Sequence, residues 1–359
     1  MPPVTVLILA PALPSDAGPL ERVLDAARVA LAERHRAGFL AAGAASVVLR
    51  REAPDDTPFG ARLRRLVGEL RPAGLVVLGA ASLPLASRAD RRAFVEAAAA
   101  DAPGALANLR HSADAIAIAR AGDVLRDLPD LPSDNALPRW LEEVVGIPVQ
   151  DLRARRRLAM DVDSPLDLLL LAGTVAGRGL PMPGLADAEP VRARLAALRA
   201  LASDPSAELL VAGRTAAVDL RWLERSTRSR TRALVEERGL RTAAAGALLG
   251  RPNRRPPRSV LGELLDGDGP GSLGRLVAAL SDGALLDSRV LLAHRLGADE
   301  RAWPPPEDRY ASDLLLPGRV RDPWLRDLTI AAADAPVPIL LGGHGLVGPG
   351  VRLALGARR

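Results

Sequence analysis

Residues 74–79 have the sequence GLVVLG, an uninterrupted apolar run of strand length between two glycines. Two similar runs precede it, at residues 4–10 (VTVLILA) and 46–49 (SVVL). Between the three runs, residues 19–31 and 59–70 place apolar side chains three and four positions apart, as an amphipathic helix does. Strands this apolar, alternating with helices, predict a parallel sheet covered on both faces, with any ligand beyond the carboxyl ends of the strands.

The remaining chain extends this pattern and then changes character. Further strands are predicted at residues 113–119 and 158–162, and further helices at 91–100 and 134–145. The fold class predicted for residues 1–175 is a Rossmann-like, three-layer α/β domain with a mostly parallel sheet. A glycine- and proline-containing linker is predicted at residues 176–190, followed by a mainly helical C-terminal domain at 191–359.

The composition excludes several kinds of chemistry. The 359 residues include no lysine, so all 48 basic residues are arginine, and Schiff-base catalysis and a P-loop lysine are excluded. The absence of cysteine excludes disulfides, thiolate nucleophiles and cysteine-ligated metals. The net charge of +5 and an aromatic content of 2% argue against a nucleic-acid partner, which needs basic and stacking surfaces.

The location of the protein is inferred from what the chain lacks. Residues 1–3 (MPP) lead directly into the first apolar run without a basic segment, and no run approaches the roughly 18 apolar residues that cross a bilayer. We therefore expect a cytoplasmic protein with no membrane partner.

Two short motifs carry a family resemblance. Residues 79–85 (GAASLPL) follow the third apolar run, and residues 161–168 (DVDSPLDL) follow the last. With the alternating strands and helices, they make the N-terminal half similar to the glycosyltransferase-A-like (GT-A) nucleotidyltransferases, which include the molybdenum-cofactor and phospholactate guanylyltransferases. That family resembles the nucleotide-diphospho-sugar transferases in fold.

The resemblance implies a magnesium site. In the family, carboxylates at two strand ends hold Mg²⁺, which neutralises triphosphate oxygens while an acceptor attacks in line, without a protein nucleophile. It therefore implies that Asp161 and Asp163 are metal ligands. Ala81 or Ser82 stands where the family has its other aspartate. A second interpretation stays open for Asp163, since an aspartate before Ser164-Pro165 is also typical of a helix cap.

Other residues are candidates for contacts with a nucleotide. Gly79 and Ser82 belong to the first motif, and Asn108 is placed to hydrogen-bond a base or sugar. Arg225 and Arg228 belong to a stripe of four arginines, with Arg221 and Arg232, on a helix predicted at residues 218–238. This stripe could bind phosphates, or it could be a solvated helix face.

Two functions fit these observations. The first is a divergent Mg²⁺-dependent nucleotidyltransferase-like protein that binds a nucleoside triphosphate or nucleotide sugar. The alternative is a non-catalytic binding or assembly protein that retains the fold. In either case the expected ligand is a nucleotide or another phosphate-bearing small molecule.

Overall fold

The computed structural model describes residues 2–53, 55–240 and 255–356, and it divides into two compact units. Unit 1 consists of Met1–Asp16 and Asp25–Val162, and unit 2 of Ala17–Leu24 and Asp163–Arg359. This division differs from the one expected at residues 175 and 176–190. Unit 2 already begins at Asp163.

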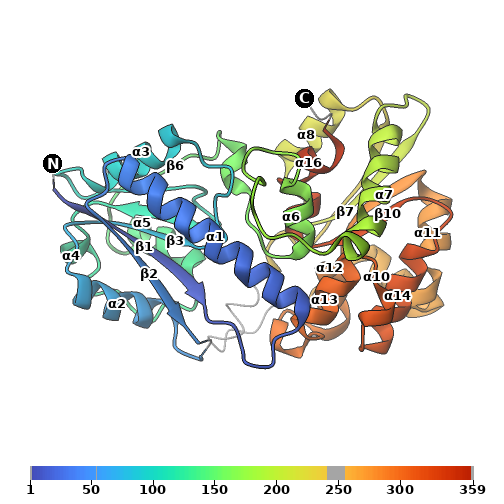
Figure 1. Cartoon of the computed structure of the whole chain (residues 1–359), viewed down its shortest axis with the longest axis horizontal. Coiled ribbons are helices and arrows are strands. Elements are labelled where there is room, and N and C mark those ends of the chain that lie inside the picture. Colours follow the sequence, from blue (N-terminus) through green and yellow to red (C-terminus); the bar gives the residue numbers. More distant parts are fainter. Residues whose placement is uncertain (1, 54, 241–254, 357–359) are drawn as a thin grey trace. The chain divides into compact units, whose positions relative to one another are not determined.

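Unit 1 is built on a six-stranded sheet with the strand order β2-β1-β3-β5-β4-β6 (Figure 1). Its strands are β1 (Val4–Pro11), β2 (Ser46–Glu52), β3 (Gly74–Gly79), β4 (Ala105–Ala107), β5 (Ala115–Ile118) and β6 (Val149–Asp151). Its helices are α1 (Pro19–Ala41, whose first residues belong to unit 2), α2 (Phe59–Leu70), α3 (Arg88–Ala98), α4 (Ala121–Val124) and α5 (Leu137–Glu143), with 3-10 turns at Asp134–Ala136 and Arg156–Ala159.

The sheet of unit 1 is mixed, but five of its six strands run in one direction and only β5 is opposed to them, so the prediction of a mostly parallel sheet fails at β5 alone. Strands β1, β2 and β3 are parallel, as the sequence predicted. Strand β5 is antiparallel to β3 and β4, whereas β4 and β6 are parallel. The connection at residues 108–114 explains the reversal, because it is too short for the crossover that parallel neighbours require and instead closes a hairpin.

The strand predicted at residues 158–162 is wrong. Arg156–Ala159 forms a 3-10 turn, and beyond it Asp161 makes an isolated antiparallel bridge with Ser82. Leu158 and Met160 are buried, so the apolar run reflects packing rather than strand pairing.

Helices cover both faces of this sheet, as expected for an α/β domain. One core contains Val6 and Ile8 of β1 together with Phe39 of α1 and Phe94 of α3. The other core lies on the opposite face, because it contains the intervening residue Leu7 together with side chains of α2 and α5. This alternation along β1 produces the three-layer arrangement.

Unit 2 has a sheet of its own, which the expectation of a mainly helical domain missed. Its four strands are all parallel, in the order β10-β9-β7-β8. The strands are β7 (Glu208–Gly213), β8 (Arg230–Val235), β9 (Gly283–Asp287) and β10 (Ile339–Gly342). The helices are α6 (Pro165–Leu171), α7 (Leu185–Ala202), α8 (Ala217–Ser226), α10 (Val260–Asp268), α11 (Leu273–Leu280), α12 (Ser288–Leu296), α13 (Pro306–Asp313), α14 (Pro323–Ala333), α15 (His344–Val347) and α16 (Val351–Leu355), with 3-10 turns at Pro270–Ser272, Glu300–Ala302 and Pro317–Arg319.

The helix predicted at residues 218–238 is confirmed in its first part and wrong in its second. Helix α8 ends at Ser226, Thr227 is extended, and β8 follows. Strand β8 lies at the edge of the sheet, and four of its six residues are exposed, Arg230 and Arg232 among them. Since Arg225 lies on α8 and Arg232 on β8, the four arginines do not form one helical stripe.

Helix α1 begins in unit 2, where an acidic side chain holds its first turn. Backbone N–H groups of Leu20 and Glu21 donate to Glu307 Oε2 at 3.0 and 3.2 Å. Leu20 belongs to the core of unit 2, whereas Phe39, near the other end of α1, belongs to unit 1. One helix therefore supplies side chains to both units.

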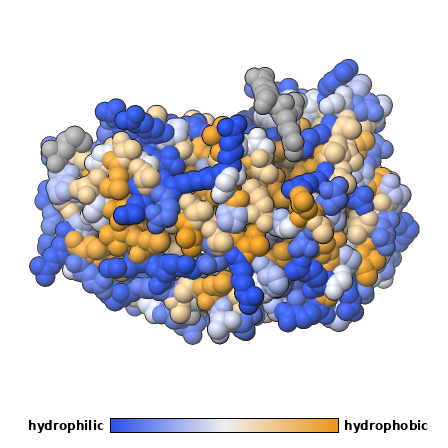
Figure 2. Space-filling model, in the orientation of Figure 1, coloured by the Kyte–Doolittle hydropathy of each residue, from blue (hydrophilic) through white to orange (hydrophobic). Residues whose placement is uncertain are grey.

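The surface carries charged residues with apolar residues between them. On the face drawn in Figure 2, hydrophilic side chains are interrupted by separate apolar areas. Such areas are normal for a folded chain. Among the described residues, no helix combines the length and the apolar character that a membrane span requires.

Candidate functional site

The two motifs of the family resemblance meet within unit 1. The turn after β3 lies beside the segment that ends in Asp161, since Ser82 and Asp161 form a bridge and Val162 N–H donates to Ala81 O at 3.1 Å. The turn is also tied to β1, because Ala80 N–H donates to Leu9 O at 2.8 Å. Asp161 therefore lies at the carboxyl edge of the parallel strands, where ligands of open α/β sheets bind.

The backbone of this turn is strained. Leu83, which follows Ser82, has a positive φ of 52° although it carries a full side chain, and it is buried. A left-handed conformation costs such a residue about 1 kcal/mol or more, so surrounding contacts must hold it in place. Strain of this kind is concentrated at functional sites, which makes the turn a candidate from geometry as well as from sequence.

A buried histidine that the sequence analysis missed supports the same turn. His35 of α1 lies 2.8 Å through Nε2 from Ser82 O, so Nε2 carries the proton and donates. Among the described residues, no partner reaches its Nδ1. Burial, followed by the nearby Arg91, lowers the pKa of His35 to about 4. His35 is thus a neutral donor that fixes the Ser82 carbonyl. The spacing of Leu31, His35 and Phe39 along one helix face is the signal that could have found it.

A pocket opens at the carboxyl ends of β1 and β2. Its volume is about 310 Å³, and it is lined by Leu9, Ala10, Pro11, Arg50, Glu52, Asp55 and Arg62. Arg62 of α2 pairs with Asp55 at 2.5 Å and lies 3.6 Å from Glu52. The pocket therefore offers both guanidinium donors and carboxylate oxygens next to the strand that is bonded to the motif turn.

The other residues predicted to bind a nucleotide either lie in unit 2 or have all their hydrogen-bonding groups paired within the protein. Asn108 has no exposed surface, and its amide closes the β4–β5 hairpin by accepting from Asp114 N and Ala115 N and donating to Asp114 Oδ2 and Leu158 O. It has a structural role. Arg225 and Arg228 are exposed in unit 2, on α8 and in the loop after it.

The pair of aspartates in the second motif is divided between the two units. Asp161 is 7% exposed and belongs to unit 1, whereas Asp163 is exposed and belongs to unit 2. The helix α6 that follows is capped by Ser164 together with Asp167, whose Oδ2 accepts from the backbone N–H groups of Asp163 and Ser164. The capping function suggested for Asp163 is therefore performed by its neighbours.

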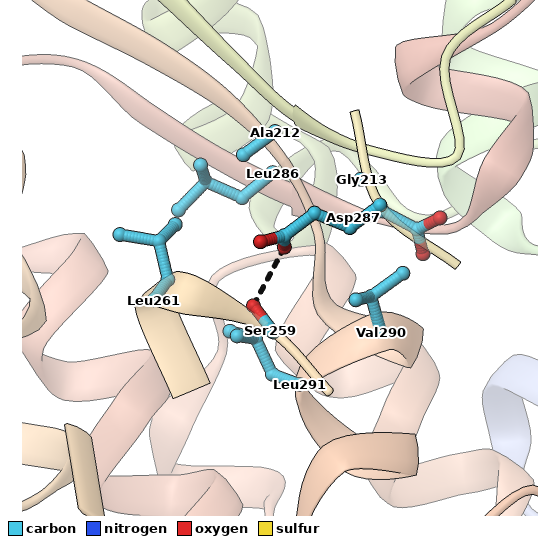
Figure 3. Close-up of a pocket in the computed structure, with 9 residues that line it drawn as sticks. Ala212, Gly213, Ser259, Leu261, Leu286, Asp287, Val290 and Leu291 are labelled. Atoms are coloured by element: carbon cyan, nitrogen blue, oxygen red, sulfur yellow. Dashed lines mark hydrogen bonds between the residues drawn. The ribbon is translucent and has the colours of Figure 1, made fainter. Parts of the chain in front are cut away.

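In unit 2 the corresponding edge of the sheet is filled. Strand β7 lies between β8 and β9, so the switch point of the chain is between β7 and β9. The cavity there has a volume of about 10 Å³, enough for one water (Figure 3). Ser259 Oγ donates to Glu236 Oε2 at 2.7 Å across it, and Leu261 and Leu291 close it.

Buried ion pairs cross-link that edge. Arg214, after β7, binds both carboxylate oxygens of Asp287, at the end of β9, with Nε to Oδ2 at 2.6 Å. A Cβ at Gly213 would lie 2.3 Å from Asp287 Cβ, and the φ of this residue is +125°, so glycine is required there. Arg289 makes a second two-pronged pair with Asp313 at 2.6 and 2.5 Å. These ion pairs stabilise the edge of the sheet, and they leave the four charged side chains bonded to one another.

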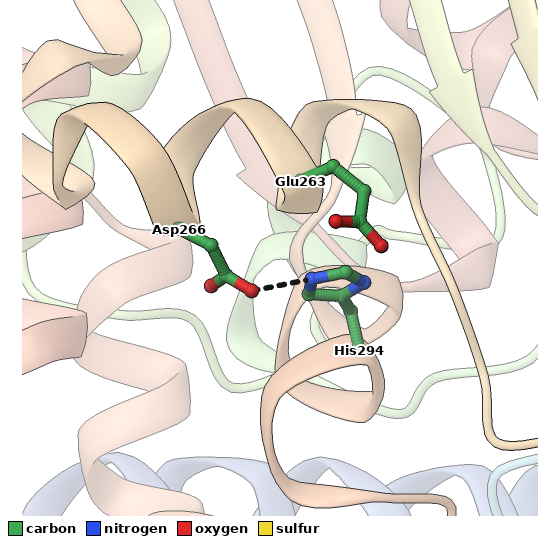
Figure 4. A group of neighbouring side chains, drawn as sticks. All are labelled: Glu263, Asp266 and His294. Carbon is green, nitrogen blue, oxygen red and sulfur yellow. Dashed lines mark hydrogen bonds and ion pairs between the residues drawn. The ribbon is translucent and has the colours of Figure 1, made fainter.

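One group of side chains in unit 2 has the composition of a metal site. Glu263, Asp266 and His294 bring their ligand atoms within 4.8 Å of one another (Figure 4). However, His294 Nδ1 accepts from Ser259 N–H at 3.1 Å, so the proton lies on Nε2, which faces Asp266 at 3.1 Å. A metal on Nε2 would require the other tautomer and would oppose two N–H groups at Nδ1. The group fits a bond between helices rather than a metal centre.

No protein-family model, curated protein or solved structure matches this chain.

Proposed function

We propose that the chain binds a nucleoside triphosphate or a nucleotide sugar at the carboxyl edge of the unit 1 sheet, as its resemblance to the nucleotidyltransferases implies. The observation that carries the proposal is the bridge between Ser82 and Asp161, which brings two motifs about eighty residues apart in sequence to one turn. The strained Leu83 and the pocket beside β1 support it.

The donor groups fit a magnesium ion that arrives with its nucleotide. Mg²⁺ is commonly held by one or two carboxylates together with substrate phosphates, and Asp161 is the carboxylate of the second motif that is bridged to this turn. The ion would neutralise phosphate charge when bound. Asp161 would hold the ion, Arg50 and Arg62 would bind the anionic ligand, and His35 would hold the turn by its bond to Ser82 O.

Binding without group transfer is the second candidate, and one observation favours it. The resembled enzymes place a carboxylate on each of two strands, whereas the turn after β3 presents Ala81 and Ser82. A single carboxylate supports ligand binding but leaves less charge to orient a metal during in-line attack. We therefore propose that this site retains a nucleotide without transferring it.

Calorimetric titration of the full chain tests both proposals. We expect GTP or another nucleoside triphosphate to bind with Mg²⁺ present, and Mg²⁺ alone to show no measurable binding. Asp161→Asn should weaken the binding about tenfold or more, because a neutral amide loses its attraction to the ion. Asp101→Asn is the matched control, since this exposed carboxylate precedes β4 and therefore lies at the opposite edge of the sheet.

The outcomes separate the candidates. Release of pyrophosphate from a bound triphosphate in the presence of an acceptor would show that transfer is retained. If none of the four nucleoside triphosphates binds with Mg²⁺ present, and UDP-glucose and GDP-mannose do not bind either, the proposed function is wrong.

A further inference from the structure

Two arginines near the motif turn converge on one buried carboxylate. Asp90, in the first turn of α3, has no exposed surface. Its Oδ1 accepts from Arg155 Nη1 at 2.9 Å and from Arg157 Nη2 at 2.7 Å. Because both guanidinium groups donate to the same oxygen atom, they lie side by side.

The second arginine exceeds what Asp90 needs. Arg157 alone reaches both carboxylate oxygens, with Nη2 2.7 Å from Oδ1 and Nε 3.2 Å from Oδ2, which is the two-pronged geometry that satisfies a buried carboxylate. Ser87 adds a hydroxyl and a backbone N–H bond to the same oxygen. Burial opposes ionisation of Asp90, but the bonds from Ser87 and the two arginines outweigh it and lower its pKa to about 2. Asp90 is therefore charged, and one positive charge remains in excess.

The excess charge faces solvent. The side chains of Arg155 and Arg157 are 38% and 43% exposed, while the carboxylate beneath them is fully covered. Their guanidinium planes are held by Asp90, so little conformational entropy remains to be lost when an anion binds. If the arginines served only to pair with the buried Asp90, Arg157 alone would be enough.

We propose that Arg155 and Arg157, oriented by Asp90, bind a phosphate or pyrophosphate group. Paired guanidinium groups match the oxygens of such an anion, and the net charge of the cluster is positive. The segment that carries the pair is fixed to residues 81–90 at two points, by Asp90 and by the Ser82–Asp161 bridge. The site does not depend on nucleotide binding, because a free phosphate ester or pyrophosphate has the same chemistry.

Titration of the full chain with inorganic pyrophosphate, without Mg²⁺ and at low ionic strength, tests the site. We expect measurable binding that weakens as salt is added. Arg155→Gln should reduce the affinity about tenfold or more, the loss expected for a charge-assisted bond. Its melting temperature should change little, because Arg157 still satisfies Asp90. Arg92→Gln is the matched control, since Arg92 is exposed on α3 and pairs with Glu96.

A second variant tests the phosphate site if Arg155→Gln does not fold. If Arg155→Gln does not fold, Arg155→Lys retains the charge but not the planar fork, and it should still reduce affinity several-fold. Wild-type protein that binds no pyrophosphate, or an Arg155→Gln protein that is folded and binds with unchanged affinity, would overturn the proposal.

Comparison of ligands identifies the source of the phosphate. If a nucleoside triphosphate binds more tightly than pyrophosphate and both are weakened by Arg155→Gln, the phosphates of the nucleotide occupy the site. If pyrophosphate binds but no nucleotide does, the proposed function fails while the anion site stands.

Discussion

The two units place charged side chains at the carboxyl edges of their sheets, but they use them differently. In unit 2, Arg214 and Arg289 each have a fully buried aspartate partner, and the switch point has room for one water. In unit 1, a pocket of about 310 Å³ lies beside β1, and two half-exposed arginines share one aspartate. The charged side chains at the edge of unit 2 are therefore paired and buried, whereas part of the edge of unit 1 is open to solvent.

Buried titratable groups sharpen the contrast, because they respond to pH in opposite directions. Burial, assisted by the neighbouring Asp163, raises the pKa of Asp167 in unit 2 to about 7. Burial lowers the pKa of His35 in unit 1 to about 4. Acidification should therefore stabilise unit 2 through one group and destabilise unit 1 through the other.

The largest expected effect concerns the buried pair in unit 2. Arg289→Met should lower the free energy of unfolding by about 4 kcal/mol, because Asp313 would remain buried without its partner. The double variant Arg289→Met, Asp313→Leu should lose less. Arg275→Met, which breaks an exposed pair with Asp268, should cost less than about 1 kcal/mol.

Fluorescence can assign that loss to unit 2. Trp140 is the single tryptophan of unit 1, so a Trp140→Phe background leaves only the three tryptophans of unit 2 as reporters during denaturant unfolding. An unchanged transition in Arg289→Met would show that this pair does not stabilise the edge.

Asp167 should make unit 2 less stable as the pH rises. Its carboxyl ionises near pH 4 in the unfolded chain but only near pH 7 in the fold, so its favourable contribution is complete below pH 4 and lost by about pH 7. The difference amounts to about 4 kcal/mol. Asp167→Asn should remove this pH dependence, measured with the same tryptophan reporters. A slope identical to that of the wild type would contradict the assignment.

His35 should make unit 1 less stable as the pH falls. The unfolded chain takes up a proton near pH 6.5 and the fold only near pH 4, so about 3 kcal/mol is lost between these values. His35→Gln can still donate to Ser82 O but does not titrate. Hydrogen exchange in β3 should therefore depend less on pH in this variant, and equal dependence would exclude His35 as the cause.

The smallest effect is expected for the arginines that the sequence had placed on one helical stripe. Since Arg225 and Arg228 lie on different local structures and are exposed, Arg225→Ala, Arg228→Ala should change the free energy of unfolding by less than about 0.5 kcal/mol. Pyrophosphate binding should also be unchanged in calorimetry. A tenfold loss of pyrophosphate affinity in this variant would indicate that the phosphate site lies in unit 2 and not in unit 1.

The sequence predicted the strands and helices that have a clear local pattern. The α2 prediction at residues 59–70 is confirmed to the residue, and β1, β2 and β3 are parallel, as predicted. The reversal at β5 could not be read from the alternating run at 113–119, because periodicity does not encode strand direction. It depends on the short hairpin that Asn108 closes.

The errors in unit 2 have a different cause. Residues 218–238 contain apolar and arginine residues at spacings compatible with a helix, and β8 is only six residues long and lacks a regular alternation of buried and exposed residues. The apolar runs that form β7 and β9 are short. Each ends in a residue that is typical of a strand end, Gly213 or Asp287, and these residues were the signal from which the two strands could have been predicted. The partnership of Asp90 with Arg155 joins residues 65 positions apart, and no local pattern predicts it.

The division of α1 between the units sets the order in which the chain can be completed during synthesis. Residues 1–16 and 25–162 can form the whole unit 1 core once they have left the ribosome. Leu20, by contrast, belongs to a core whose other members lie between Leu166 and Leu355, so one of the first segments made must wait for one of the last. Its acidic anchor, Glu307, also comes late. A protein truncated after unit 1 would therefore expose an apolar helix end, and a protein starting at Asp163 would lack part of its own interior.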